Sequence, residues 1–128
     1  MKSRWQQLLP FTPDTDYLVL ASNIPARSWG STGRLFKGSQ AVKRQLHDTP
    51  GVVGYSLLAR PVRKHYATLS VWSDAEALRA FSASSDHGRL MVELGPEMAP
   101  TRFVRWTIRG DDGVPSWRDA LRRLADPG

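Results

Sequence analysis

The 128-residue sequence predicts a single α+β domain in which helices cover one face of an antiparallel β-sheet. Three observations lead to this prediction. Segments rich in β-forming residues alternate with amphipathic helical segments, and two of the β-rich segments are separated by only five residues, as in a β-hairpin. Hydrophobic residues make up 41% of the chain, which is enough for one core, whereas two full domains do not fit this length.

The first strand and the first helix are expected between residues 16 and 47. Residues 1–15 contain two prolines and no periodicity, so we expect an irregular lead-in. Residues 16–24 form a β-rich run that ends at Pro25, and its length suits a strand buried on both faces. An amphipathic helix follows, because four residues recur at helical spacing with basic residues roughly opposite them: Leu35, Ser39, Val42 and Leu46.

A β-hairpin and two short helices are expected next. Residues 52–59 and 65–72 are its two strands. Residues 73–76 read Ser-Asp-Ala-Glu, a capping box whose Ser hydroxyl and Glu carboxylate satisfy free backbone N–H groups at the start of a helix that runs to about Ala83. Residues 84–86 cap a further short helix, which carries a stripe at i, i+3, i+4 and i+7: His87, Leu90, Met91 and Leu94.

The last strand is expected at residues 101–108, and a second capping box at residues 116–119 starts a C-terminal helix. This order of elements is the split β-α-β arrangement of ferredoxin-like folds, with a core at 16–109 and a helical extension at 110–128. Strands this apolar on both sides leave a large apolar patch on the sheet face away from the helices. We therefore expect a homodimer formed through that open face.

The composition excludes several classes of function. There is no cysteine, which excludes disulfides, cysteine-ligated metal sites and thiol nucleophiles. No apolar run reaches the roughly 18 residues that span a bilayer, and no signal-peptide pattern is present, so we expect a cytoplasmic protein without a membrane partner. The net charge is +6, but the basic residues are spread along the chain, so a nucleic-acid partner is not expected. The three histidines are scattered, so no metal site is expected.

The middle of the chain resembles a known group of proteins. A strand that ends in Ser-Val-Trp at Trp72, a capped helix carrying Phe81 and the run Ser-Ser-Asp-His-Gly-Arg-Leu-Met at 84–91 are similar to the dimeric α/β-barrel superfamily. That superfamily includes antibiotic-biosynthesis-type and haem-degrading monooxygenases. The similarity covers about residues 16–109, and residues 103–124 are closer to an uncharacterised branch. The resemblance implies a ferredoxin-like sheet that pairs with a second copy to form a barrel.

The cofactor-independent oxygenases of this superfamily imply one activity. They hold an electron-rich aromatic substrate in a closed apolar pocket between helices and sheet, where the deprotonated substrate reacts with dioxygen itself. The resemblance therefore implies a monooxygenase-like enzyme without a cofactor, or a binder of a small apolar or aromatic ligand. Two other interpretations stay open, namely a non-catalytic dimeric structural or sensing module and a haem-binding protein.

The haem-degrading relatives supply candidate site residues. In those relatives an Asn at the end of the first strand, an aromatic residue after the Val-Trp strand and a His on the next helix contact the haem. Asn23 and Phe81 match the first two, whereas Met91 stands where the haem-ligating His is found and His87 lies one helical turn earlier. This departure weakens the case for haem binding. Haem binding stays open, because Met and a displaced His can both ligate haem iron.

We expect His87 and Asn23 to be the catalytic residues. An imidazole on an otherwise apolar stripe acts as a general base near neutral pH. The expected ligand-binding residues are Phe36, Trp72, Phe81 and Met91. Each candidate also has a structural interpretation, as a helix-start residue, a turn residue or part of the core. The sequence leaves open whether Tyr66, Trp72 and Arg105 face the pocket or the dimer interface.

Overall fold

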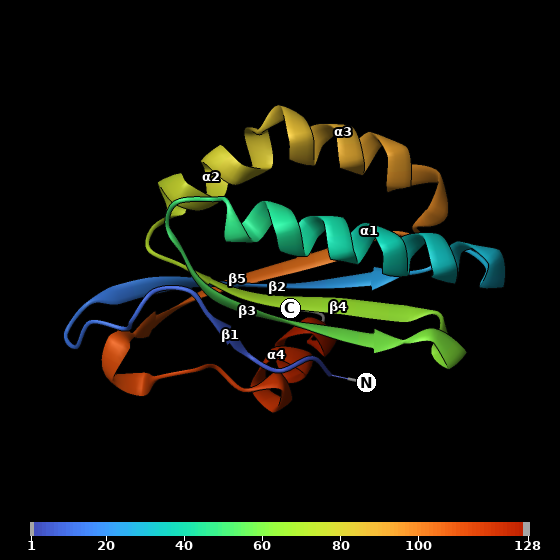
Figure 1. The fold of residues 1–128 in the computed structure, drawn as a ribbon. Coiled ribbons are helices and arrows are strands. Elements are labelled where there is room, and N and C mark those ends of the chain that lie inside the picture. The colour runs from blue at the N-terminus through green and yellow to red at the C-terminus, as the bar shows by residue number, and fades with distance from the viewer. Residues whose placement is uncertain (1, 127–128) are drawn as a thin grey trace.

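The computed structural model describes residues 2–126, apart from the side chains of Pro61 and Ser85. These residues form a five-stranded antiparallel sheet with the strand order β1-β3-β4-β2-β5 and four α-helices (Figure 1). The prediction of an α+β, ferredoxin-like fold is confirmed, and the sheet stays open rather than closing into a barrel. The elements in chain order are β1 (Gln6–Gln7), β2 (Asp16–Pro25), α1 (Trp29–His47), β3 (Val52–Arg60), β4 (His65–Trp72), α2 (Ala75–Ala83), α3 (Ser85–Leu94), β5 (Arg102–Arg109) and α4 (Trp117–Ala125).

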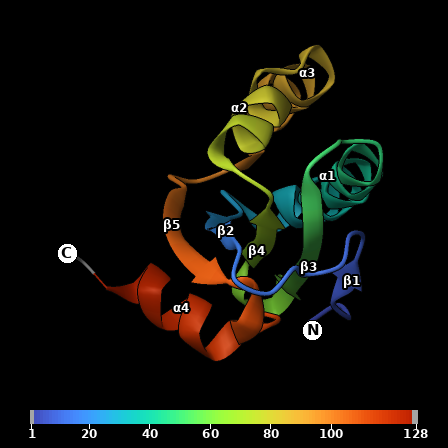
Figure 2. The same ribbon diagram turned by 90° about the vertical axis from the view of Figure 1, so that its left-hand side faces the viewer.

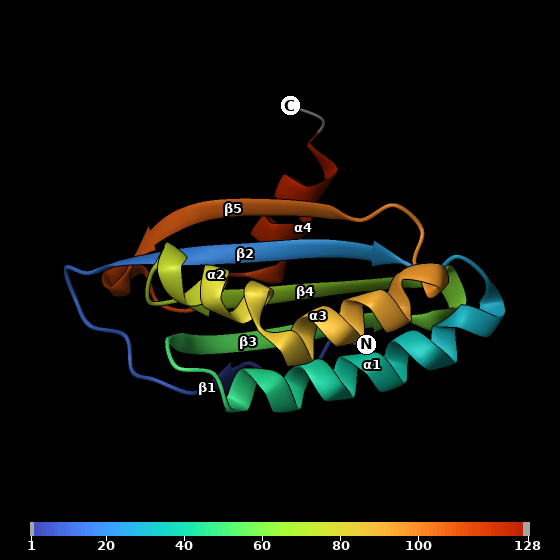
Figure 3. The same ribbon diagram turned by 90° about the horizontal axis from the view of Figure 1, so that it is seen from above.

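The helices lie on both faces of the sheet. Figure 2 shows α1, α2 and α3 on one side, as the sequence predicts, and α4 on the other. In Figure 3 α1 and α3 run along the strands, whereas α4 crosses beneath them. None of the helices within residues 2–126 is both long and apolar enough to cross a membrane.

Local sequence signals account for the helix starts. Ser84 caps α3 by accepting a hydrogen bond from the His87 backbone N–H, and Ser116 caps α4 in the same way from Asp119. The cap of α2 is Asp74 rather than Ser73, because the Asp74 carboxylate accepts from the Ala77 backbone N–H at 2.8 Å. The predicted cap at Ser73 is therefore wrong by one residue, because Asp and Ser are equally good caps and stand side by side here.

The lead-in is more ordered than its sequence suggests. Gln6 and Gln7 form the edge strand β1, paired with Tyr55 and Gly54 of β3. Gly54 makes this approach possible, because a Cβ at that position would lie 2.5 Å from Trp5 Cζ2 and 2.8 Å from the Gln6 carbonyl oxygen. A two-residue strand is too short to produce an alternating pattern, so periodicity alone misses it.

The sheet face that the sequence predicts to be open is largely covered by this same chain. Val19, Ala21 and Val71 of that face have no exposed surface, and α4 packs Ala120 and Leu124 against them. Trp5 and Phe11 of the lead-in add to the cover. The amphipathic pattern of α4 shows that the helix buries one side, but it does not reveal which surface receives that side.

Candidate functional site

A cavity of about 330 Å³ lies between α1 and the sheet. Its walls are α1, the facing parts of β3 and β4, and the segment that includes the end of α3, and they are predominantly apolar. This volume is within the usual range of small-molecule sites, which are about 300–1,000 Å³ and mostly apolar. The cavity therefore has the size and the lining expected for a small apolar ligand.

The cavity opens between α1 and the first residues of the described chain. Phe36 is 49% exposed at this opening, and Lys43 lies two helical turns further along α1. On the opposite rim, Lys2 pairs with Leu58 and the Ser3 backbone N–H donates to the Leu57 carbonyl at 2.7 Å. Main-chain hydrogen bonds thus hold this rim against β3.

The closed end of the cavity depends on a glycine. Gly38 on α1 is buried against Leu94 of α3, and a Cβ at Gly38 would lie 2.5 Å from Leu94 Cδ1. A residue without a Cβ therefore lets α1 and α3 approach closely here. Met91 and Met98 complete this end, and their unbranched side chains adapt readily to an irregular surface.

The polar side chains at the cavity are mostly committed to protein partners. The Tyr66 hydroxyl donates to the Thr32 carbonyl of α1 at 2.8 Å, and burial raises the pKa of Tyr66. The Thr68 hydroxyl is hydrogen-bonded to the Ser22 hydroxyl. Two cations, Lys2 and Lys43, are the charged lining residues within 2–126, and neither forms an ion pair with the described residues. The interior is thus apolar and the charge is confined to the rim.

The structure brings two of the six predicted site residues to this cavity. Phe36 and Met91 line it, whereas Trp72, Phe81 and His87 form a separate stack beneath α2 and at the start of α3. The ring centroids of Trp72 and Phe81 are 5.3 Å apart, and those of Phe81 and His87 are 4.3 Å apart. Trp72 and Phe81 are therefore core residues in this structure.

His87 lies at the edge of that core. Its Nδ1 is 3.2 Å from Gln45 Oε1 of α1, and burial lowers its pKa. If Gln45 Oε1 accepts this hydrogen bond, the proton is on Nδ1 and Nε2 is left as an acceptor. The imidazole is absent from the cavity lining described for residues 2–126. Its role as a catalytic base stays a prediction.

Asn23 lies on the opposite face of the sheet. It pairs with Ala67 and follows Val19 and Ala21 by steps of two residues, so it shares their outward face. Its Oδ1 is hydrogen-bonded to His65 Nε2. The structure thus separates Asn23 from His87 by the thickness of the sheet. Alternation along the strand places Asn23 on the same face as Ala21, but it does not show which face the helices cover.

The structure places the three residues whose orientation the sequence leaves open. Tyr66 lines the cavity, and Trp72 is buried beneath α2. Arg105 stands opposite Leu20 of β2, so it lies on the helix-bearing side of the sheet, where it is exposed on the edge strand β5. Sequence reasoning missed Lys43 as a lining residue, although it follows Phe36 at the i+7 spacing that places two residues on one side of a helix.

The predicted haem contacts do not converge. Met91 is at the cavity, His87 stacks on Phe81 outside it, and Asn23 is on the other face of the sheet. These residues do not fit a single haem, and we derive no chemistry through one. No cluster of three or more metal-ligating side chains occurs within residues 2–126.

Comparison with solved structures shows the same fold in several proteins. SnoaB, a cofactor-independent oxygenase from Streptomyces nogalater, matches with a TM-score of 0.59 and 18% identity over 74% of this chain and 95% of that chain. An antibiotic biosynthesis monooxygenase matches with a TM-score of 0.63 and 16% identity over 77% and 99%. A protein of unknown function from Nitrosomonas europaea has a TM-score of 0.63 and 14% identity over 73% and 90%. At these identities the likeness shows the fold alone.

Comparison at the level of sequence assigns the family. No curated protein matches the chain. One family does match, over residues 21–126, which is most of the chain and includes β4, α2, α3 and α4. Its description is a domain of unknown function. The chain belongs to the DUF3291 family.

Proposed function

We propose that this protein binds a small, largely apolar or aromatic molecule in the cavity beneath α1 and promotes its reaction with dioxygen without a cofactor. The observation that carries the proposal is the cavity itself, an apolar space of about 330 Å³ with a defined opening. Cofactor-independent oxygenases and antibiotic biosynthesis monooxygenases with the same fold support the reaction class. The sequence identity to these proteins is low, so the proposed reaction needs a direct test of dioxygen consumption.

The cavity supports such a reaction by excluding water and orienting the substrate. An electron-rich aromatic substrate, once deprotonated, transfers an electron to dioxygen, and an apolar enclosure keeps the intermediates away from solvent. Histidine and carboxylate side chains are absent from the lining within residues 2–126. We therefore assign formation of the anion to the acidity of the substrate itself, with its proton released to solvent.

A non-catalytic binding module is the second candidate function. The absence of histidine and carboxylate side chains from the lining within residues 2–126 favours it, since a well-placed general base commonly contributes a factor of about 10²–10⁴ to the rate. Both functions require the cavity to take up an apolar molecule. Only the first requires consumption of dioxygen.

Uptake of an apolar molecule is tested with the neutral fluorescent probe N-phenyl-1-naphthylamine. We expect saturable binding of one probe per chain. Ala59→Phe places a ring into the cavity between β3 and α1 and should weaken binding at least tenfold, whereas Val62→Phe, at a position 82% exposed on the neighbouring turn, should leave it unchanged. Equal binding by both variants would mean that the probe sits elsewhere, and the proposal would fail.

Catalysis is tested with anthrone and an oxygen electrode, with no added cofactor. The balanced reaction converts one anthrone and one dioxygen to one anthraquinone and one water, so the substrate supplies all the electrons. We expect uptake of dioxygen above the rate in buffer and its loss in Ala59→Phe. Probe binding without accelerated dioxygen uptake, with anthrone and with other electron-rich phenols, would favour the binding module.

The predicted homodimer needs a different surface from the one that the sequence suggests. Because α4 covers Val19, Ala21 and Val71, a second copy placed on that side would pack on α4 and β5 instead of on a bare sheet. We propose that any dimer includes α4 in its interface. Sedimentation distinguishes the 14.3 kDa monomer from a dimer, and a dimer unaffected by charge-reversing substitutions on the exposed side of α4 would contradict this placement.

A further inference from the structure

The charge distribution around the cavity is one-sided. The rim carries Lys43 on α1 and Lys2 on the N-terminal segment, while the lining within residues 2–126 includes no acidic side chain. Neither lysine is an ion-pair partner of a described acidic residue. Two cations in the lining of one apolar cavity, with no acidic side chain beside them, favour a bound molecule that carries an anionic group.

We propose that the ligand is an apolar molecule that carries one terminal carboxylate, with its apolar body in the cavity and its carboxylate between Lys2 and Lys43. This inference rests on the proposed function, because it specifies the class of molecule that enters the same cavity. It adds one prediction to the proposed function. The protein should bind a carboxylic acid more tightly than the alcohol of equal chain length.

The position of the lysines fixes the orientation of such a ligand. A carboxylate placed deep in the cavity would lose its hydration without gaining a partner, because the Tyr66 hydroxyl already donates to Thr32 and the interior beyond it is apolar. At the rim the same carboxylate keeps part of its hydration and gains two cations. The apolar end therefore points toward Leu94 and Met98.

The rim is built in a way that keeps both cations near the opening. Lys43 is half-buried on the rigid helix α1, two turns from Phe36. Lys2 is exposed, but its backbone is fixed to Leu58, and the Ser3 hydroxyl accepts from the Leu57 backbone N–H at 2.9 Å. A fixed backbone reduces the entropy that would be lost when the ligand is bound.

The test compares decanoate with decanol on the intact chain by displacement of N-phenyl-1-naphthylamine. The measured quantity is the ratio of the two dissociation constants, which cancels effects common to both ligands. Lys43→Ala and Lys2→Ala should each lower the preference for decanoate by up to about fivefold, as expected for a partly exposed ion pair. Raising the salt concentration should lower the preference in the wild-type chain as well.

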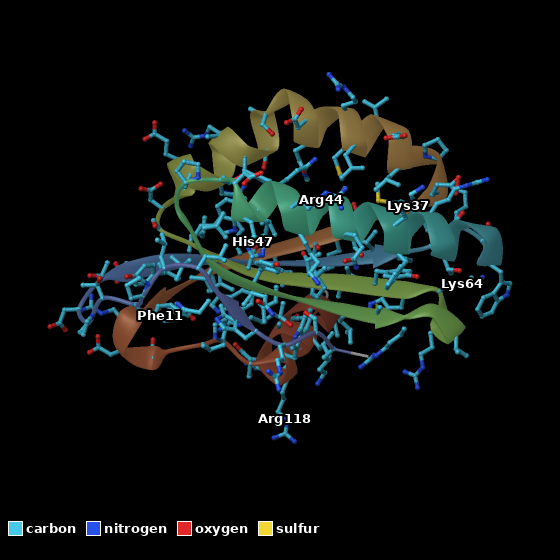
Figure 4. All side chains as sticks on the ribbon, viewed as in Figure 1. Phe11, Lys37, Arg44, His47, Lys64 and Arg118 are labelled. Atoms are coloured by element: carbon cyan, nitrogen blue, oxygen red, sulfur yellow. The ribbon has the colours of Figure 1, made fainter. Side chains whose placement is uncertain are left out.

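Lys37→Ala is the matched control. Lys37 is also on α1 (Figure 4) and is exposed, but it does not line the cavity, so its removal should leave the ratio unchanged. A ratio that falls equally in Lys37→Ala would indicate a general effect of net charge and would overturn the inference, as would a ratio unchanged in both rim variants. In either case the proposed function stands if the neutral probe still binds, and it fails separately if no probe binds.

Discussion

The Tyr66 hydroxyl on β4 donates a 2.8 Å hydrogen bond to the Thr32 carbonyl of α1, across the layer between the helix and the sheet. This contact ties the first turn of α1 to the sheet beside the cavity. Tyr66 is 7% exposed, and burial raises its pKa, so the hydroxyl stays protonated and remains a donor at neutral pH. The roof of the cavity is thus held to its floor by a side chain that also lines it.

Replacement of Tyr66 by Phe removes this hydrogen bond and keeps the ring. We expect the free energy of unfolding to fall by about 1 kcal/mol, the usual net contribution of one hydrogen bond. Because α1 becomes less firmly attached, binding of the neutral probe should also weaken, by a few-fold. Urea denaturation and probe titration measure the two effects, and unchanged values for both would show that packing alone holds α1 in place.

The pKa of His87 predicts a pH-dependent stability. Burial lowers this pKa below its ordinary value of 6.5, so the folded state favours the neutral imidazole. The associated stability is fully present above pH 6.5 and is lost as the pH falls through the lower folded-state pKa, because the unfolded chain then binds more protons. Burial also lowers the pKa of His65, and the positive charges of Arg60 and Arg63 lower it further.

Replacement of His87 by Phe should therefore flatten part of the stability change between pH 7 and pH 5. His65 continues to contribute, so some of the slope remains. Urea denaturation at several pH values measures it, and an undiminished slope would show that His87 is not responsible. His87 lies outside the cavity lining, so the variant should bind the neutral probe within about twofold of the wild-type chain. A much larger loss of probe binding would show that His87 contributes to the binding site.

The pair Asn23 and His65 allows a separate test of the other predicted catalytic residue. Asn23→Ala leaves His65 without its hydrogen-bond partner on the outward face of the sheet. We expect a loss of about 1 kcal/mol in stability with no change in probe binding. Any uptake of dioxygen that the wild-type chain supports should also persist in Asn23→Ala. Abolished uptake with unchanged stability would instead support the catalytic role predicted for Asn23.

The sequence predicted the strands and helices better than it predicted what they pack against. The hairpin strands were expected at 52–59 and 65–72, and β3 and β4 are Val52–Arg60 and His65–Trp72, because alternation and turn residues are local signals. The side on which Asn23 lies depends on the register of β2, and the surface that α4 covers depends on tertiary packing. The cavity likewise depends on how closely α1 and α3 approach at Gly38.

The outward face of the sheet should depend on α4 for its stability. Leu124 is 7% exposed and packs in the cluster that contains Val19, Leu69 and Val71. Leu124→Ala should lower the free energy of unfolding by about 2–5 kcal/mol, the range for large-to-small substitutions in a core.

Arg118 provides the control for this substitution. It is on the same helix but exposed, and its side chain points away from the body of the molecule (Figure 4), so Arg118→Ala should change stability by less than about 0.5 kcal/mol. If Leu124→Ala is as mild as the control, α4 does not hold the sheet face in solution. In that event the uncovered Val19, Ala21 and Val71 would be free to receive a second copy, and the chain should sediment as the homodimer that its strands alone predict.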